Sequence, residues 1–272
     1  MYHLRLGTSI QFADENFYRK LSRAKELGFD SVDFDIAGFS DDRAKEIENH
    51  KHLEEGLSAV RESGLFLNGV HISFSPYWNF AAPDEADRRA SVGRTKEIFG
   101  RIDSFKPFCY IVHGSLEPIP ERRRPDFIVS LERSLAELAV STPRKVCVEN
   151  LPRTCLLNTA EEACSIIDKF PNIGICADLN HFLQETTESA LLKLGRRVQT
   201  LHVSDCDYVN ERHWLPGRGK IEWQKVLAAL ESIGYDGVFN YETVGAALED
   251  IKENYDRLFA SYEEWKNGGA GL

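Results

Sequence analysis

The sequence predicts a single-domain α/β protein folded as a (β/α)8 barrel, with residues 1–266 in the domain and residues 267–272 in a flexible C-terminal tail. Two observations predict this fold. Short apolar runs rich in β-branched residues alternate with longer amphipathic segments along the whole chain, which is the pattern of βα units around a parallel sheet. The 272 residues hold eight such runs, spaced about 34 residues apart, and the total is close to the roughly 250 residues usual for this barrel.

Each apolar run is expected to be a strand that is covered on both faces. The eight expected strands are LRLGTS (4–9), SVDFDI (31–36), FLNGVHI (66–72), FCYIVHG (108–114), KVCVEN (145–150), IGICAD (173–178), VQTLHV (198–203) and GVFNYE (237–242). Helices are expected between them, because segments such as 17–27 and 248–262 carry apolar side chains at helical spacing. Gly28 is placed to end the first of these helices.

Charge and composition limit the partners. The chain has 33 Lys and Arg against 43 Asp and Glu, a net charge of −10, which disfavours nucleic acid or an anionic membrane as the main partner. No apolar run is long enough for a membrane span, and the N-terminus lacks the layout of a signal peptide, so we expect a cytoplasmic protein. The six cysteines form no CxxC pair, and we expect them to be reduced and mostly buried.

Six successive strands of the expected barrel end at a metal-binding or proton-transferring side chain. These residues are His71, His113, Glu149, Asp178, His202 and Glu242. The active site of such a barrel lies at the C-terminal ends of its strands, where these side chains would converge. Because converging carboxylates and imidazoles need a positive partner, the set predicts a divalent cation. Three carboxylates and one imidazole suit Mn²⁺, Mg²⁺ or Co²⁺, and the ligand types also allow Zn²⁺.

Several motifs in this order match a known family. They are LGTSI, VHGS, VENLP, ADLNHF, LHVSD, RHWLPGRGKIEW and GYDGVFNYE. With them the sequence resembles the xylose isomerase-like TIM barrels, in particular the sugar and sugar-phosphate isomerase and epimerase branch that includes the ketose 3-epimerases. The resemblance implies a carbohydrate substrate and one divalent metal ion, with Mn²⁺ the expected ion, held by Glu149, Asp178, His202 and Glu242. Homo-oligomers are common in that family, so a homo-oligomer is one possibility here, and the sequence does not decide the oligomeric state.

The resemblance also assigns chemistry. Glu149 and Glu242 are implied to be the catalytic pair on opposite sides of a keto-sugar or related polyol. One removes a proton beside the carbonyl, and the other returns a proton to the cis-enediolate. The segment ENLPR has no lysine after Glu149, whereas the xylose isomerases proper carry one there for hydride transfer, so proton transfer is favoured.

Further side chains are expected to bind substrate. His71 and His113 lie at strand ends, and His181 matches a family histidine that contacts substrate. Arg212 and His213 belong to a segment that closes over substrate in the family, and Trp78 follows strand three, where its flat face could stack on a sugar. Asp205 and Asp207 are expected to shape the loop after strand seven. No role is assigned to Asp33 or Asp35.

Two alternatives use the same side chains. A lyase or dehydratase acting on a keto-sugar or keto-inositol would share the first proton abstraction and then expel a group. An endonuclease IV-like multi-zinc phosphodiesterase would need further ligands, and the sequence offers His71, His113, His181, Glu211 and His213. The net charge and the lack of a long basic loop weigh against the nuclease.

Overall fold

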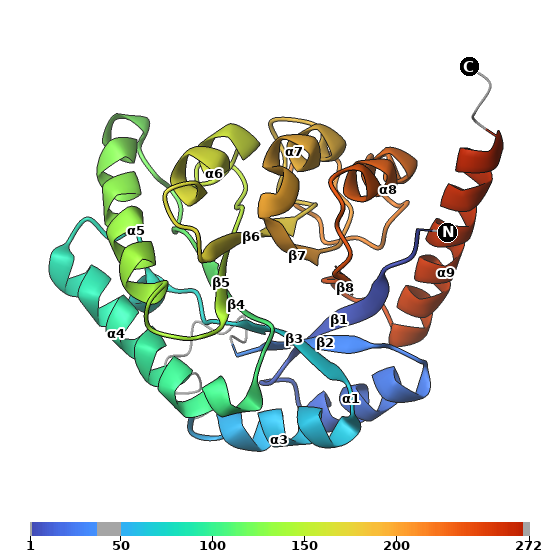
Figure 1. The fold of residues 1–272 in the computed structure, drawn as a ribbon, viewed down its shortest axis with the longest axis horizontal. Helices are drawn as coiled ribbons and strands as arrows, with labels where there is room; N and C mark the ends of the chain where they lie inside the picture. The colour runs from blue at the N-terminus through green and yellow to red at the C-terminus, as the bar shows by residue number, and fades with distance from the viewer. Residues whose placement is uncertain (1, 37–49, 269–272) are drawn as a thin grey trace.

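Eight parallel strands form the centre of the protein in a computed structural model that describes residues 2–36 and 50–268. Helices surround the strands (Figure 1). Neighbouring strands pair in the order β7-β6-β5-β4-β3-β2-β1-β8. The remaining gap, between β7 and β8, is bridged where Val203 N donates to Asn240 O at 2.8 Å and Glu242 N donates to Val203 O at 3.1 Å. The fold is therefore a nearly closed (β/α)8 barrel in one domain.

The strands lie where the alternating pattern predicts them, with ends that differ by at most two residues. They are β1 (Arg5–Gln11), β2 (Ser31–Asp35), β3 (Phe66–His71), β4 (Cys109–His113), β5 (Lys145–Glu149), β6 (Ile173–Asp178), β7 (Val198–His202) and β8 (Val238–Tyr241). The α-helices among the described residues are α1 (Phe17–Glu26), α3 (Leu53–Ser63), α4 (Glu85–Ile102), α5 (Arg124–Leu138), α6 (Ala160–Ile167), α7 (Thr187–Leu194), α8 (Trp223–Ser232) and α9 (Leu248–Gly268).

The helices begin and end where local chemistry directs. Helix α1 buries Phe17, Leu21 and Ala24, and the chain leaves it through Gly28, whose φ of 81° lies in the left-handed region that glycine adopts easily. Helix α4 is capped by Asp84, whose carboxylate accepts hydrogen bonds from two backbone N–H groups of the first turn. Helix α9 continues to Gly268, two residues into the segment expected to be a tail; residues 269–272 lie outside the description.

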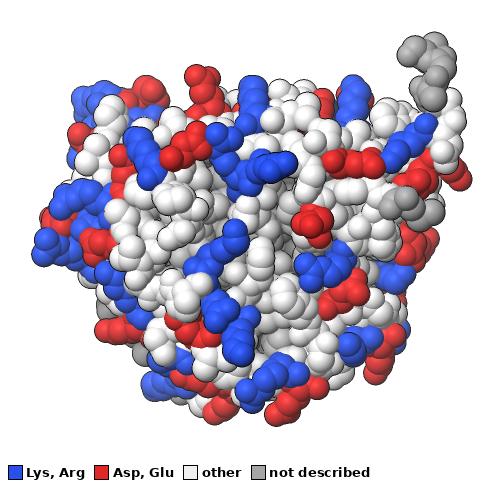
Figure 2. Space-filling view, viewed as in Figure 1, with Lys and Arg blue, Asp and Glu red and all other residues white. Residues whose placement is uncertain are grey.

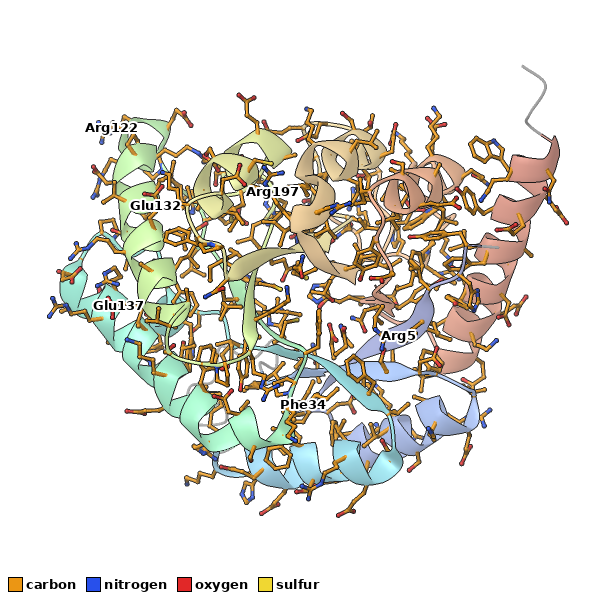
Figure 3. The ribbon with its side chains drawn as sticks, in the orientation of Figure 1. Arg5, Phe34, Arg122, Glu132, Glu137 and Arg197 are labelled. Atoms are coloured by element: carbon orange, nitrogen blue, oxygen red, sulfur yellow. The ribbon has the colours of Figure 1, made fainter. Side chains whose placement is uncertain are left out.

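Apolar side chains fill the space between the strands and the helices (Figure 3). Phe34, labelled there on β2, packs against the rings of Phe12 and Phe17 at centroid distances of 5.1 and 5.6 Å. Inside the barrel, a small apolar layer contains three cysteines, Cys109, Cys147 and Cys176, together with Ile111. All six cysteines are free, as expected, and Cys164 alone of them is not fully buried.

The surface is strongly charged. Figure 2 shows acidic and basic side chains interspersed around the edge of the face seen in Figure 1. Among residues 2–36 and 50–268, no helix is both long enough and apolar enough to pass through a bilayer.

Candidate active site

The C-terminal ends of the strands open into a cavity of about 210 Å³. Seven of the residues selected from the sequence line this cavity: His71, His113, Glu149, His181, Glu211, His213 and Glu242. They come from the ends of β3, β4, β5 and β8 and from the loops after β6 and β7. The cavity therefore lies at the end of the barrel where this fold carries its catalytic side chains.

Glu149, Asp178, His202 and Glu242 come together as one group. Each offers one ligand atom, and these four atoms lie within 4.8 Å of one another. His202 Nδ1 is 3.3 Å from Glu149 Oε1 and 3.2 Å from Glu242 Oε2. The parallel register sets Asp178 beside His202 and Glu149 beside Cys176 of the next strand, so the grouping follows from the pairing of β5, β6 and β7.

The group has the unsatisfied atoms that a cation site leaves. In the described part of the chain, Asp178 Oδ2 and His202 Nδ1 are buried and have no hydrogen-bond partner. Buried polar atoms without a partner are costly and uncommon in folded proteins. The other carboxylate oxygen of Asp178 accepts a hydrogen bond from the backbone N–H of Asn180 at 2.8 Å, which fixes its orientation. Three carboxylates and one imidazole with free ligand atoms fit a divalent cation.

The two glutamates carry negative charge at neutral pH. Burial acts to raise the pKa of Glu242, but the positive charge of nearby His202 outweighs it and brings the pKa to about 2. Burial likewise opposes ionisation of Glu149, and His202 and His113 together hold the pKa of that carboxyl well below its usual range. Asp178 differs, because burial raises its pKa to about 6. Both glutamates are thus in the form that accepts a proton.

Two histidines fix the Glu149 carboxylate from the side of β3 and β4. His71 Nε2 bonds to Glu149 Oε2 at 3.0 Å, and its Nδ1 bonds to the backbone oxygen of Ile72 at 3.0 Å. His113 Nε2 lies 3.3 Å from the same Glu149 oxygen, and the Phe74 ring stacks on His113 with centroids 4.2 Å apart. Burial lowers the pKa of His71, but the contact with Glu149 prevails and raises it to about 9.

A second imidazole pair lies on the opposite wall. His181 Nδ1 bonds to Asn150 O at 3.0 Å, and its Nε2 lies 3.1 Å from Glu211 Oε2. The second imidazole of the pair, His213, has a φ of 49°, which is uncommon for a residue with a side chain. The backbone N–H of His213 donates to Asn180 Oδ1 at 3.3 Å. Asn180 thereby couples this loop to the segment that follows Asp178.

Two residues expected to bind substrate do not line the cavity in the described structure. Arg212 donates from Nε to Asp207 Oδ2 at 2.8 Å, and its guanidinium lies 5.6 Å from the ring centre of Trp214. Trp78 is only 4% exposed and packs with its ring centre 5.5 Å from the Arg94 guanidinium. A nearby carboxylate holds Arg212 within its own loop, and Trp78 packs beneath the loop after β3.

Arg153 is a cavity residue that the sequence did not suggest. Its Nε donates to Glu117 Oε1 at 3.0 Å, and its Nη1 donates to Asn210 Oδ1 at 2.9 Å and to Glu211 Oε1 at 2.8 Å. These contacts join the loops after β4, β5 and β7 at the cavity wall. The residues involved are up to 94 positions apart in the chain, so no local sequence pattern predicts these contacts.

Asp205 organises the loop after β7, as the sequence predicted. It is fully buried, and its Oδ2 accepts hydrogen bonds from Gly217 N at 2.7 Å and Trp223 Nε1 at 3.0 Å. Its Oδ1 accepts from Cys206 N at 2.9 Å and Ile221 N at 3.2 Å. One carboxylate therefore fixes the loop that carries Arg212 and His213.

Known proteins are similar to this chain in sequence and in fold. Residues 21–261 match the family described as xylose isomerase-like TIM barrel. A ketose 3-epimerase of Arthrobacter globiformis is 23% identical over 253 residues, which cover 87% of this chain and 81% of that protein. A D-psicose 3-epimerase of Ruminiclostridium cellulolyticum is 25% identical over 243 residues, covering 83% of this chain and 76% of the relative.

The structural comparison agrees with the sequence comparison. A D-tagatose 3-epimerase-like protein of known crystal structure superposes with a TM-score of 0.81 at 21% identity, and the match covers 98% of this chain and 100% of that chain. At 21% identity, this structural similarity shows the fold alone. Because the family match spans most of the barrel, the chain belongs to the xylose isomerase-like TIM barrel family.

Proposed function

We propose that the protein is a divalent-metal-dependent sugar isomerase or epimerase that acts on a keto-sugar or related polyol. The observation that carries this proposal is the group of Glu149, Asp178, His202 and Glu242, whose ligand atoms lie within 4.8 Å of one another. Two of its members, Glu149 and Glu242, line the cavity. Two relatives that match over more than three quarters of their length are named ketose 3-epimerase and D-psicose 3-epimerase. A ketose is therefore the first substrate to test.

The two glutamates are proposed to exchange protons with the substrate. One ionised carboxylate removes the proton from the carbon beside the carbonyl and leaves a cis-enediolate. The other glutamate takes up a proton from solvent and delivers it to the opposite face, which inverts that carbon, and the first glutamate returns the abstracted proton to solvent; each positioned base contributes about 10²- to 10⁴-fold. A divalent cation held by the four side chains, for which Mn²⁺ is our choice, supplies Lewis-acid stabilisation of the negative charge on the substrate oxygens.

The neighbouring histidines are proposed to hold and orient rather than to take the proton. His71 and His113 both contact one oxygen of Glu149, so this carboxylate has little freedom to rotate. A fixed carboxylate lies in the reactive geometry before substrate arrives, which lowers the entropic part of the barrier. His181 and His213 line the same cavity and are proposed to bind the sugar hydroxyls.

The test is proton exchange followed by NMR. A panel of ketoses, keto-sugar phosphates and inososes is incubated in deuterium oxide with the Mn²⁺-loaded protein. We expect one substrate to lose the signal of the proton beside its carbonyl and to give an epimer or isomer. An elimination product would identify the lyase alternative, and no exchange with any member of the panel would contradict the shared chemistry.

A second candidate is favoured by a specific observation. Two more groups have ligand atoms within 4.8 Å of one another, namely His71, His113 and Glu149, and His181, Glu211 and His213. Together with the first group they give the ligand set of a multi-zinc phosphodiesterase. Metal analysis after zinc loading separates the two candidates, because the epimerase needs one ion per chain. Three zinc ions per chain together with cleavage of abasic DNA would favour the phosphodiesterase.

A further inference from the structure

We propose that Asp33 is a positioning residue that fixes the tautomer and orientation of His202, so that Nδ1 of the imidazole is presented to the metal. This inference rests on the proposed metal centre and adds a residue from β2, a strand that contributes nothing to the four-residue group. Asp33 and His202 lie inside the barrel, on β2 and β7, and both are fully buried. The carboxylate is therefore beyond the reach of solvent.

The two ring nitrogens of His202 face different partners. Nδ1 is directed at Glu149 and Glu242, at 3.3 and 3.2 Å. Nε2 faces Asp33 Oδ2 at 3.5 Å. Within the described residues, neither Nε2 nor this carboxylate oxygen has a hydrogen-bond partner. Asp33 is therefore the acidic side chain that faces Nε2, while Cys176 is a further polar group close to the same imidazole.

A network across the barrel holds the Asp33 carboxylate in place. Asn68 of β3 donates from Nδ2 to Asp33 Oδ1 at 2.7 Å and to Thr200 Oγ1 at 3.0 Å. Thr200 lies two residues before His202 on the same strand, so the same amide ties the carboxylate to the strand that carries the imidazole. One oxygen of Asp33 is thus occupied, and the other is left for His202.

Glycine at position 69 makes room for this arrangement. A Cβ there would lie 2.9 Å from Asp33 Cγ and 2.8 Å from Ile111 Cδ1, closer than side chains pack. Gly69 pairs with Asp33 in the parallel register of β2 and β3. The missing side chain at position 69 therefore leaves the space that the Asp33 carboxylate occupies.

The chemistry of a histidine ligand explains why the acceptor matters. An imidazole that binds a cation through Nδ1 is neutral and carries its proton on Nε2, and that N–H needs an acceptor when it is buried. A carboxylate in this place fixes the ring and raises its basicity as a ligand. The negative charge of Asp33 in turn needs a buried donor, because an uncompensated charge in the core is strongly destabilising.

The first test measures metal affinity and leaves turnover aside. Binding of Mn²⁺ to the apo protein is measured by calorimetry for the wild type, for Asp33→Asn and for the matched control Asp30→Asn. Asp30 lies three positions earlier and accepts the Leu6 N–H at 2.8 Å, a contact that an amide oxygen can also make. We expect Asp33→Asn to weaken Mn²⁺ binding about 10- to 100-fold and Asp30→Asn to leave it unchanged.

Two outcomes would overturn the inference, and a third would separate it from the proposed reaction. If Asp33→Asn lowers the Tm of the apo protein but binds Mn²⁺ as the wild type does, Asp33 is only a structural residue. If the wild type binds no divalent cation, the role of Asp33 fails together with the metal centre. An inactive wild type that binds Mn²⁺ and loses affinity on Asp33→Asn would refute the proposed reaction and leave this inference standing.

A second measurement reads the tautomer directly in the wild type. Long-range ¹H–¹⁵N correlation spectra of the Zn²⁺-loaded wild type report the tautomer of each histidine, and Asp33→Asn assigns the His202 signal if that variant folds. We expect His202 to carry its proton on Nε2. A His202 ring protonated on Nδ1, or on both nitrogens, in the loaded protein would contradict the proposed orientation.

Discussion

Replacement of Asp205 by asparagine is expected to destabilise the protein strongly although the side chain keeps its size. The carboxylate accepts four N–H groups, two on each oxygen, and all are within 3.2 Å. An asparagine has one oxygen and one NH₂ group. Whichever way it is turned, two of the four donors lose their acceptor and face another donor.

The cost follows from the number of donors left without an acceptor. Each buried unsatisfied donor costs about 1–3 kcal/mol, so two give about 4 kcal/mol. For a chain of this size, each kcal/mol corresponds to about 2–4 °C, and we expect the Tm to fall by about 10 °C. Because the same loop carries Glu211 and His213 at the cavity, substrate binding is expected to weaken as well.

Differential scanning calorimetry of Asp205→Asn measures this change, with Asp168→Asn as the control. Asp168 forms an exposed ion pair with Arg197, and pairs of this kind contribute at most about 1 kcal/mol. A fall in Tm for Asp205→Asn that is no larger than for the control would refute the reasoning. It would mean that the four hydrogen bonds do not hold the loop.

Other predictions follow from the site and from the ion pair between the buried Arg88 and the partly exposed Glu137. Glu149→Gln and Glu242→Gln are each expected to abolish turnover in the NMR assay while the circular dichroism spectrum stays that of the wild type; near-normal rates would contradict the two-base mechanism. Removal of metal by a chelator is expected to lower the Tm, and Mn²⁺ at 100 times its Kd to restore about 2.7 kcal/mol, whereas a Tm that does not respond to Mn²⁺ would count against the metal centre. The guanidinium of Arg88 lowers the pKa of Glu137, so this carboxylate stabilises the fold above its unfolded pKa, and the contribution disappears as the pH falls through the folded pKa. Urea unfolding at pH 6 and pH 3 should therefore show a smaller acid loss for Glu137→Gln than for the wild type, and equal losses would contradict this assignment.

The periodicity of the sequence was sufficient to predict where the strands lie and which residues stand at their C-terminal ends. A strand of a parallel barrel is buried on both faces, so it appears as a short apolar run, and its last polar residue marks the C-terminal edge. For this reason Glu149, Asp178, His202 and Glu242 could be selected without a structure, and the fold brings them into one group. Their roles as ligands and bases stay predictions.

The sequence did not predict the partners of side chains in loops and in the barrel interior. Arg212 was expected at the substrate, yet Asp207 of the same loop binds its guanidinium. Arg153 meets Glu117 and Glu211 through contacts that exist only when three loops are folded. The link between Asp33 and His202 depends on two strands that are not neighbours in the barrel, and no sequence spacing encodes it.

The ion pairs of Arg153 have a consequence for the engineering of specificity. Because one guanidinium joins the loops after β4, β5 and β7, the position of each loop depends on the other two. If a single loop were exchanged for that of a relative, Arg153 or its carboxylate partners would lose their ion pairs. The two loops that were not exchanged would then shift at the cavity wall. The three loops therefore form one transferable unit, and a graft intended to change the preferred sugar should carry all of them together.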